Sequence, residues 1–193
     1  MSNQQSEIIR SFESEIKNCE AIIELGANVG LITKKILLHN KPVYAFEPEP
    51  EAFKLLSLIK SPNLTILNKA AWIKEQMMQL HRHKDWLNTK SHTSSSLKID
   101  KKNVDDKNSI NCETVDIADY IISLNKKVLI KMDIEGAEYD VINHLLDKNA
   151  FEKIERIYCE FHPKKIQFGY FQHYKLKIRL FFKGYSNRIK NWF

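Results

Sequence analysis

Short apolar runs alternate with stretches of helical periodicity along most of the chain. The apolar runs, which predict strands, lie at residues 21–25, 43–46, 64–68, 110–115, 128–132 and 156–161. Apolar residues three and four positions apart predict helices at residues 5–18, 30–39, 50–59, 116–123, 138–147 and 171–183. Strands that alternate with helices are typical of a parallel sheet covered by helices. The pattern therefore predicts an α/β fold.

The pattern is less regular in the middle and at the end of the chain. Residues 76–81 predict an added strand, whereas residues 87–96 and 100–109 are polar and predict loops. Gly184 predicts the end of the last helix, and residues 185–193 predict a final strand. We see no internal repeat, so the expected organisation is an N-terminal helical extension at residues 1–20 and one domain at residues 21–193.

The composition excludes several protein classes. Five glycines and five prolines among 193 residues are too few for a fibrous or disordered chain. No apolar run approaches the roughly 18–20 residues of a membrane span, and the first residues lack the pattern of a secretory signal. We therefore expect a cytoplasmic protein. Cys19, Cys112 and Cys159 are widely spaced and odd in number, which predicts neither a disulfide framework nor a metal cluster.

The net charge of +6 is concentrated near the end of the chain. Residues 164–193 hold eight Lys or Arg and no Asp or Glu, with aromatic residues between them. Such a segment can contact nucleic acid, an anionic lipid surface or an acidic glycan. The alternative, which we favour from the sequence, is a solvated basic face that covers core aromatics.

A glycine turn follows the first predicted strand. Gly26 and Gly30 flank Ala27 and Asn28, and glycine lets a backbone approach a ligand closely. The dinucleotide fingerprint has three spaced glycines, and this turn lacks that spacing. It suits a ligand without a diphosphate, such as S-adenosylmethionine (SAM). A glycine turn that binds nothing is the alternative.

The next two strands end in residues that suit the rest of an adenosine. Glu47 follows the second strand, where a carboxylate can accept hydrogen bonds from both ribose hydroxyls. Ala70 and Ala71 are small enough to leave room for an adenine ring, and Trp72 can flank that ring or pack in the core. Ser96 lies in a loop that can reach a cofactor or a sugar.

Acidic groups gather where the strand at 128–132 ends. Asp133 stands at the carboxyl end of that strand, where ligands of doubly wound sheets bind, and is the first candidate for a general base. It can instead orient the SAM amine, or hold a divalent metal with Glu135. Lys131 can pair with an acid in the sheet or contact the acceptor. Glu138 is expected mainly to stabilise the start of the following helix.

A second pair of polar residues, Glu160 and His162, ends the strand at 156–161. His162 is a second candidate base, because the pKa of histidine is ordinarily near 6.5. With Glu160, Asp133 and Glu135 it can also complete a site for Mg²⁺ or Mn²⁺, which prefer carboxylate ligands. The alternative for His162 is a surface histidine before Pro163.

Eight motifs resemble the FkbM family of SAM-dependent methyltransferases and stand in the family's order. They are ELGANVG (24–30), FEPEP (46–50), KAAW (69–72), SSSL (94–97), ETVDIADYI (113–121), LIKMDIEGAEYDVI (129–142), CEFH (159–162) and KGY (183–185). The K-x-D-x-E-G-A-E block is the most specific of them. The resemblance covers about residues 21–185.

The resemblance implies a Rossmann-like class I methyltransferase fold with helices on both faces of a mostly parallel sheet. It also implies methyl transfer from SAM to a hydroxyl oxygen, often of a sugar or glycan. The implied cofactor-binding residues are Glu24, Gly26, Ala27, Asn28, Gly30, Glu47, Pro48, Ala70, Ala71, Trp72 and Ser96. Glu24 departs from the family, which more often has Asp there, and the sequence ends soon after KGY, so we expect a shortened C-terminal strand.

Two rival functions follow from other features. The basic, aromatic C-terminal segment is compatible with a methyltransferase that acts on RNA or another nucleic acid. The glycine turn alone is compatible with a nucleotide-binding module without catalysis. The acids after residue 132 argue against an inert module, and the missing glycine fingerprint argues against an NAD oxidoreductase.

Overall fold

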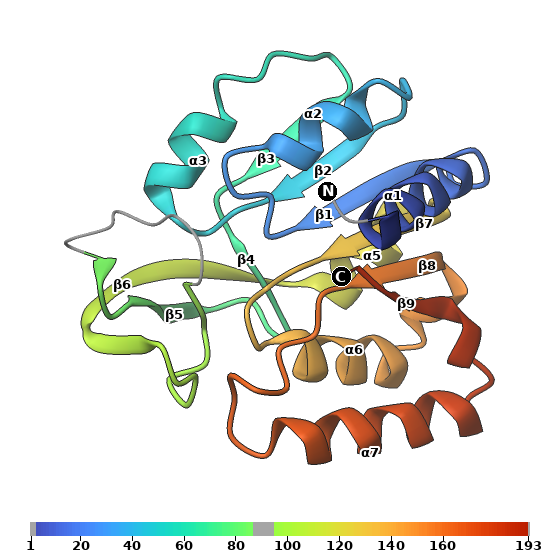
Figure 1. Cartoon of the computed structure of the whole chain (residues 1–193). Helices are drawn as coiled ribbons and strands as arrows, with labels where there is room; N and C mark the ends of the chain where they lie inside the picture. The colour runs from blue at the N-terminus through green and yellow to red at the C-terminus, as the bar shows by residue number, and fades with distance from the viewer. Residues whose placement is uncertain (1–2, 87–94, 193) are drawn as a thin grey trace.

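The computed structural model describes residues 3–86 and 95–192, and its centre is a six-stranded sheet (Figure 1). All five strand pairings in this sheet are parallel. The strands, in spatial order, are β3 (Leu64–Leu67), β2 (Val43–Phe46), β1 (Ala21–Leu25), β7 (Val128–Met132), β8 (Ile154–Cys159) and β9 (Ile189–Asn191). The order reverses between β1 and β7, and parallel sheets of this kind bind ligands at such a switch point.

Helices cover both faces of the sheet. One face carries α1 (Asn3–Ile16), α2 (Leu31–Leu37) and α3 (Pro50–Leu56); the other carries α5 (Ile117–Leu124), α6 (Glu138–Asp147) and α7 (Gly169–Phe182). Successive strand residues alternate between the faces: Ile22 packs with α1 and α2, and Ile23 packs with α5 and α6. The arrangement confirms the predicted α/β fold, with helices on both faces of a mostly parallel sheet.

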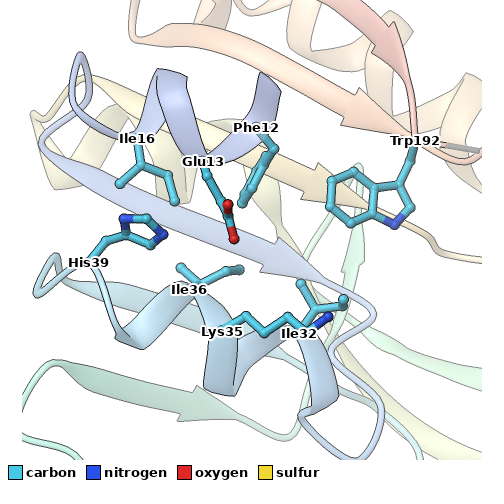
Figure 2. Close-up of a pocket in the computed structure, with 8 residues that line it drawn as sticks. All are labelled: Phe12, Glu13, Ile16, Ile32, Lys35, Ile36, His39 and Trp192. Carbon is cyan, nitrogen blue, oxygen red and sulfur yellow. The ribbon is translucent and has the colours of Figure 1, made fainter. Parts of the chain in front are cut away.

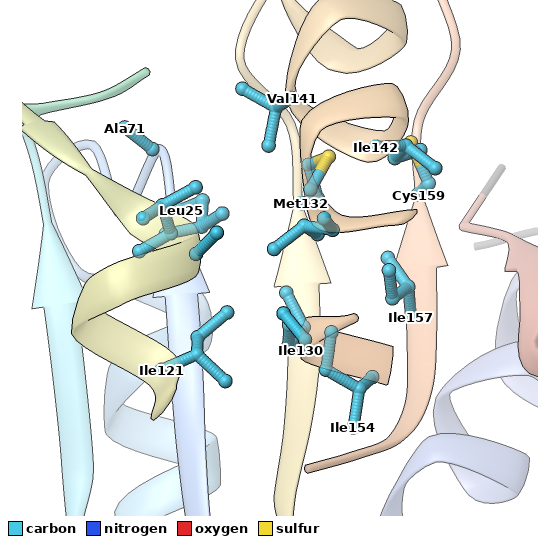
Figure 3. Close-up of a cluster of buried hydrophobic side chains, with 14 of the residues drawn as sticks. Leu25, Ala71, Ile121, Ile130, Met132, Val141, Ile142, Ile154, Ile157 and Cys159 are labelled. Carbon is cyan, nitrogen blue, oxygen red and sulfur yellow. The ribbon is translucent and has the colours of Figure 1, made fainter. Parts of the chain in front are cut away.

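The main core lies between the sheet and the helices α5 and α6 (Figure 3). Ile130 and Ile157 from the sheet meet Ile121 of α5 and Ile142 of α6, and all four are fully buried. Asp116 caps α5, because its carboxylate accepts hydrogen bonds from the backbone N–H groups of residues 118 and 119. The strands at the sheet centre are covered by helices on both faces, which is why they are almost entirely apolar.

A second, three-stranded sheet was only partly predicted. It has the order β4 (Ala70–Trp72), β6 (Val104–Asp116) and β5 (Met77–His83). The prediction of a polar loop at residues 100–109 is wrong from residue 104 onward, because β6 begins there and pairs antiparallel with β5. An antiparallel strand can be polar when one face meets water. Ala70–Trp72 is likewise a separate strand on β6, and not the end of the third strand.

Several element ends differ from the sequence prediction. Helix α2 begins after Gly30, whose left-handed backbone (φ +83°) is not helical, and β8 spans 154–159 instead of 156–161. Glu160 and His162 therefore follow that strand and do not end it. Residues 185–193 do not form one strand, because Ser186–Arg188 make a 3-10 turn, η2, before the three-residue β9. The C-terminal strand is short, as expected.

Helix α1 is packed firmly on the sheet. Phe12 makes edge-on ring contacts with Tyr158 of β8 and with Trp192, at centroid distances of 5.1 and 5.3 Å. Lys190 of β9 donates hydrogen bonds to Glu15 and Ser11 of the helix. The helix therefore closes one side of the sheet over β8 and β9. None of the helices in the described parts of the chain has the length and apolarity needed to cross a membrane.

Candidate functional site

The turn after β1 runs directly against the end of β7. Gly26 has a positive φ of +77°, and its N–H donates to the carbonyl of Phe46 at 3.0 Å. A Cβ atom at this position would lie 1.9 Å from the carbonyl oxygen of Asp133, which is too close for any side chain. Only glycine therefore fits here, because the end of β1 packs directly against the end of β7. The first carries predicted cofactor-binding residues, and the second carries Asp133.

Glu47, which follows the neighbouring strand β2, holds this turn by a hydrogen bond. Its two carboxylate oxygens accept hydrogen bonds from the backbone N–H of Asn28 at 2.7 Å and of Glu49 at 2.9 Å. Burial raises the pKa of Glu47 to about 7, although these two hydrogen bonds act in the opposite direction. The carboxylate therefore stands beside the glycine turn, at the position expected for a ribose acceptor.

Glu24 is fully buried on the α2 side of the sheet. Thr33 of α2 donates to one carboxylate oxygen at 2.6 Å, and the other oxygen, Oε1, has no hydrogen-bond partner among the described residues. Lys131 stands opposite Glu24 in the register of β1 and β7. Burial raises the pKa of Glu24 to about 7, and the Lys131 ammonium lowers this pKa. An unbonded buried oxygen is costly, so it marks a place where a ligand would supply a donor.

A pocket opens beside the glycine turn, with about 310 Å³ of space when the open solvent at its mouth is included. Several candidate cofactor residues line it, together with residues of the turn after β7. The lining residues are Gly26, Phe46, Pro48, Lys69, Ala70, Ala71, Leu80, Ser95, Leu97, Ile134 and Ala137. Ile134 and Ala137 belong to the turn that carries Glu135, so the pocket extends from the glycine turn to the turn after β7.

The acid cluster is organised around His162, whose side chain is buried. Its Nδ1 lies 2.9 Å from Oε1 of the fully buried Glu138. The same carboxylate accepts hydrogen bonds from the backbone N–H groups of Ile134 and Gly136, so it is held in place on several sides. A carboxylate that holds one ring nitrogen fixes the orientation of the imidazole and leaves the other nitrogen to act.

The other ring nitrogen, Nε2, faces three carboxylates without a hydrogen bond to any described residue. It lies 3.5 Å from Glu135, 3.6 Å from Glu160 and 3.9 Å from Asp133. The Asp133 oxygen on this side, Oδ1, is also buried and unbonded. One donor atom each from Asp133, Glu135 and His162 lies within 4.8 Å of the others, a spacing that would hold a metal ion.

Two lysines support Glu135. Its backbone is left-handed (φ +57°), and its carboxylate lies 2.7 Å from Nζ of the buried Lys101 and 3.2 Å from Nζ of Lys165. Burial raises the pKa of Glu135, but the charges of Lys101, His162 and Lys165 together hold it below its ordinary value. A left-handed non-glycine residue is unusual, and here it turns a carboxylate toward the histidine.

The surroundings of His162 and of Glu160 raise the pKa of both side chains. Burial lowers the pKa of His162, yet the hydrogen bond and charge of Glu138 and the charge of Glu135 raise it above its ordinary value. Burial and the charge of Asp133 raise the pKa of Glu160. The cluster therefore has excess negative charge that a proton or a cation would relieve.

Lys131, Ser96 and Trp72 are predicted site residues whose side chains make contacts within the protein. Lys131 donates to the carbonyl of Gly26 at 3.1 Å and lies 3.7 Å from Asp133, so it supports the turn and the acid. The Ser96 hydroxyl donates to the carbonyl of Glu135 at 2.7 Å, and its neighbour Ser95 lines the pocket. Trp72 packs at the edge of two apolar clusters.

The sequence did not indicate some of the groups that shape the site. Lys101 lies in a polar segment that resembles a solvated loop, and no pattern marks it as buried. Glu138 looks like an ordinary acid in the first turn of a helix, and its contact with His162 spans 24 positions of the chain. Both roles depend on contacts between distant segments.

A second cavity lies apart from these groups. A groove of about 250 Å³ runs between α1 and α2, where Phe12, Ile16, Ile36 and Trp192 provide most of its walls (Figure 2). It shares no lining residue with the pocket beside Gly26. Five of its lining residues are apolar, and Glu13, Lys35 and His39 complete the lining.

The sequence was compared with known families and proteins. The family model described as the methyltransferase FkbM domain matches residues 24–189, which include the glycine turn, the pocket and the acid cluster. The chain belongs to the FkbM methyltransferase family. No curated protein and no solved structure matches it significantly.

Membership of the FkbM family confirms the resemblance in the motifs and makes this chain a methyltransferase. The roles of its individual residues remain predictions. Within this methyltransferase, the matched segment begins at Glu24, the buried acid of β1, and it contains both the acid and the histidine that face one another in the cluster. The pocket beside Gly26 and the cluster around His162 are therefore the two halves of the candidate active site.

Proposed function

We propose that this FkbM methyltransferase transfers a methyl group from SAM to a hydroxyl oxygen, most readily that of a sugar in a glycan or glycosylated metabolite. The observation that carries the proposal is the imidazole of His162. Glu138 orients it, and its unbonded Nε2 faces Asp133 and Glu135 beside the pocket. An alcohol is a weak nucleophile near neutral pH, so its methylation benefits from a group that removes or weakens its proton.

The pocket beside Gly26 suits SAM. The glycine turn gives the cofactor backbone contact, Ala70 and Ala71 leave space, and Glu47 supplies a carboxylate for the ribose. The unbonded oxygen of Glu24 provides an acceptor for an ammonium group such as that of the methionine part. SAM supplies an activated methyl group, and the residues of the chain bind and orient its ends.

The cluster beside the pocket suits a divalent cation. Asp133, Glu135 and His162 are the residues that would hold it, with Glu160 close by, since carboxylates and imidazole are ligands of Mg²⁺ and Mn²⁺. The unbonded buried Oδ1 of Asp133 and Nε2 of His162 support this assignment. A bound cation would lower the pKa of the acceptor hydroxyl. Without a cation, Asp133 can accept the hydroxyl proton, and His162 is the second candidate.

Labelled-SAM transfer tests the proposal with sugars, glycans and RNA as acceptors. We expect transfer to a sugar hydroxyl, its loss in EDTA, and its return with Mg²⁺ or Mn²⁺. Asp133→Asn should retain SAM binding in calorimetry but lower turnover by about 100-fold or more, as expected for loss of a base or a metal ligand. The matched control is Asp119→Asn on the exposed side of α5, which should leave turnover unchanged.

Each outcome separates one part of the proposal from the others. Transfer to RNA alone would replace the sugar acceptor, and transfer that is insensitive to EDTA would remove the metal but leave Asp133 as the base. Normal turnover in Asp133→Asn would contradict both roles of that residue. SAM binding without transfer to any acceptor class would favour a binding module. We expect the reaction in the cytoplasm.

A further inference from the structure

The outward face of α7 carries an unusual number of exposed apolar side chains. Between 42% and 82% of the surface of each of seven such residues is exposed. They are Phe168, Tyr170, Phe171, Tyr174, Ile178, Phe181 and Phe182. Exposed apolar residues are ordinary when scattered singly, but a contiguous set marks an interaction surface.

The helical period gathers these residues on one side. Tyr170, Tyr174, Ile178 and Phe182 are four positions apart and form one row along the helix. The residues that α7 buries against the core, Gly169, Leu176 and Leu180, lie on the opposite side. Helix α7 is the outermost layer, beyond α6, and no described element covers its far side (Figure 1). The helix therefore has two apolar faces, and only one of them is used in the fold.

Lysines border the exposed face. By helical position, Lys177 lies on one edge of the apolar row and Lys175 on the other, and Lys164 and Lys183 lie just beyond the two ends of the helix. All four are exposed, and no acidic side chain of the described residues pairs with them.

The nearest acids on α6 are already neutralised. Arg179 pairs with Asp147, and Lys98 pairs with Asp140 at 3.0 Å. The chain has no acidic residue after Glu160. The surface around α7 is therefore an aromatic strip between positive charges.

We propose that this face of α7 docks onto the surface of an anionic phospholipid bilayer. A helix with aromatic residues on one side and lysines at its flanks lies in the headgroup region, where rings enter the acyl boundary and ammonium groups meet lipid phosphates. Two copies of this face would bring Lys175 and Lys177 of one chain near those of the other, and that repulsion disfavours a dimer. RNA bases can stack on the rings of such a strip, so RNA binding is one of the outcomes that the test distinguishes.

The position of α7 relates the docked surface to the acid cluster. The helix begins seven residues after His162, and Lys165 in the connecting loop pairs with Glu135. The start of α7 lies on the side of the molecule where β7 and β8 end (Figure 1). A bilayer against α7 would therefore lie beside the acid cluster and leave the opposite face, with α1 and α2, in solution.

Co-sedimentation of the full chain with vesicles tests the docking. We expect binding to vesicles of equal parts phosphatidylglycerol and phosphatidylcholine, weaker binding as salt rises, and little binding to phosphatidylcholine alone. Lys175→Glu with Lys177→Glu should weaken partition by about tenfold or more, because each lysine near an anionic surface contributes about fivefold. Phe171→Ser with Phe182→Ser should also weaken it about tenfold.

Matched variants on the opposite side of the sheet serve as controls. Lys34→Glu with Lys35→Glu makes the same charge change on exposed residues of α2, and Leu38→Ser with Leu58→Ser removes exposed apolar side chains after α2 and α3. Both should bind vesicles as the unchanged chain does. Equal loss in the controls, or no binding to anionic vesicles, would overturn the proposal. A dimer that the phenylalanine variant dissociates, or RNA binding without vesicle binding, would assign the face to another partner.

Discussion

At the scale of single residues, buried ionisable groups carry most of the candidate chemistry. Glu24, Glu47, Glu138 and His162 are nearly inaccessible to water, and each is held by hydrogen bonds to neighbouring atoms. Burying a charge is costly unless a partner compensates, so such groups persist where their chemistry is used. Their titration should therefore be visible in the behaviour of the whole protein.

Glu24 gives a prediction for the pH dependence of stability. Its folded pKa of about 7 exceeds the ordinary 4.5, so the protonated acid favours the folded state. This contribution is complete below pH 4.5 and is lost as the pH rises to about 7, with a slope of up to about 1.4 kcal/mol per pH unit. Glu24→Gln should remove that slope from the free energy of unfolding, measured in urea at several pH values.

The exposed Glu152→Gln serves as the control for this measurement and should leave the slope unchanged. An identical slope in Glu24→Gln and the unchanged chain would show that Glu24 is ionised in the folded protein at all these pH values. Glu47 also has a raised pKa near 7, so a reduced slope should remain in the Glu24 variant.

At the scale of elements, the ends of the strands matter more than their middles. The turn after β1, the end of β2 and the turn after β7 meet because β1 pairs with both β2 and β7 in parallel register. The strand middles only supply apolar surface, and many sequences would serve there. Fewer residue types fit at the glycine positions in the turns, and the reason differs from one glycine to the next.

Gly26 and Gly184 separate the two reasons for a glycine. Both have positive φ, +77° and +75°, but a Cβ at Gly26 would strike the Asp133 carbonyl, and one at Gly184 would meet nothing within 4 Å. Gly184→Ala should cost about 1–2 kcal/mol of stability, the price of a left-handed alanine. Gly26→Ala should cost more than about 3 kcal/mol, because backbone atoms must also move. Urea unfolding measures both.

SAM binding gives these two variants a second readout. Gly184 lies after α7 and far along the chain from the pocket, so its variant should bind SAM normally in calorimetry. Gly26→Ala should bind SAM weakly even where it is folded. Equal stability losses in the two variants would contradict the close approach of β1 and β7.

At the scale of the whole molecule, helix α1 is part of the folded unit. Its contacts reach Tyr158 and Trp192, which come from the last third of the chain. Phe12→Ala should therefore lower the free energy of unfolding by about 3–5 kcal/mol, as for other buried phenylalanines. The exposed Phe171→Ala removes the same atoms and should change stability by less than about 0.5 kcal/mol.

These two variants also test how α1 relates to the site. Below its unfolding temperature, Phe12→Ala should retain SAM binding, because the pocket beside Gly26 and the groove between α1 and α2 share no lining residue. A small stability loss in Phe12→Ala would show that α1 packs loosely and acts as a separable extension.

The sequence by itself determined the alternation of strands and helices and the strands at the centre of the sheet. The strands β1, β2 and β7 are short apolar runs, interrupted only by Glu24 and Lys131, with glycine or acid at their ends, and their local pattern is enough to recognise them. The motifs around Gly26, Glu47 and Asp133 indicated the family and the candidate site residues. Polar β6 escaped recognition from residue 104 because an antiparallel strand with one wet face resembles a loop in sequence.

Only the tertiary structure decided which residues act together. The pairing of Glu138 with His162, of Lys101 with Glu135, and of Thr33 with Glu24 joins separate elements, and none follows from local pattern. The same holds for α7, whose apolar residues have helical spacing on both of its faces. Periodicity shows that a face exists, but only packing shows which face the core buries and which remains exposed.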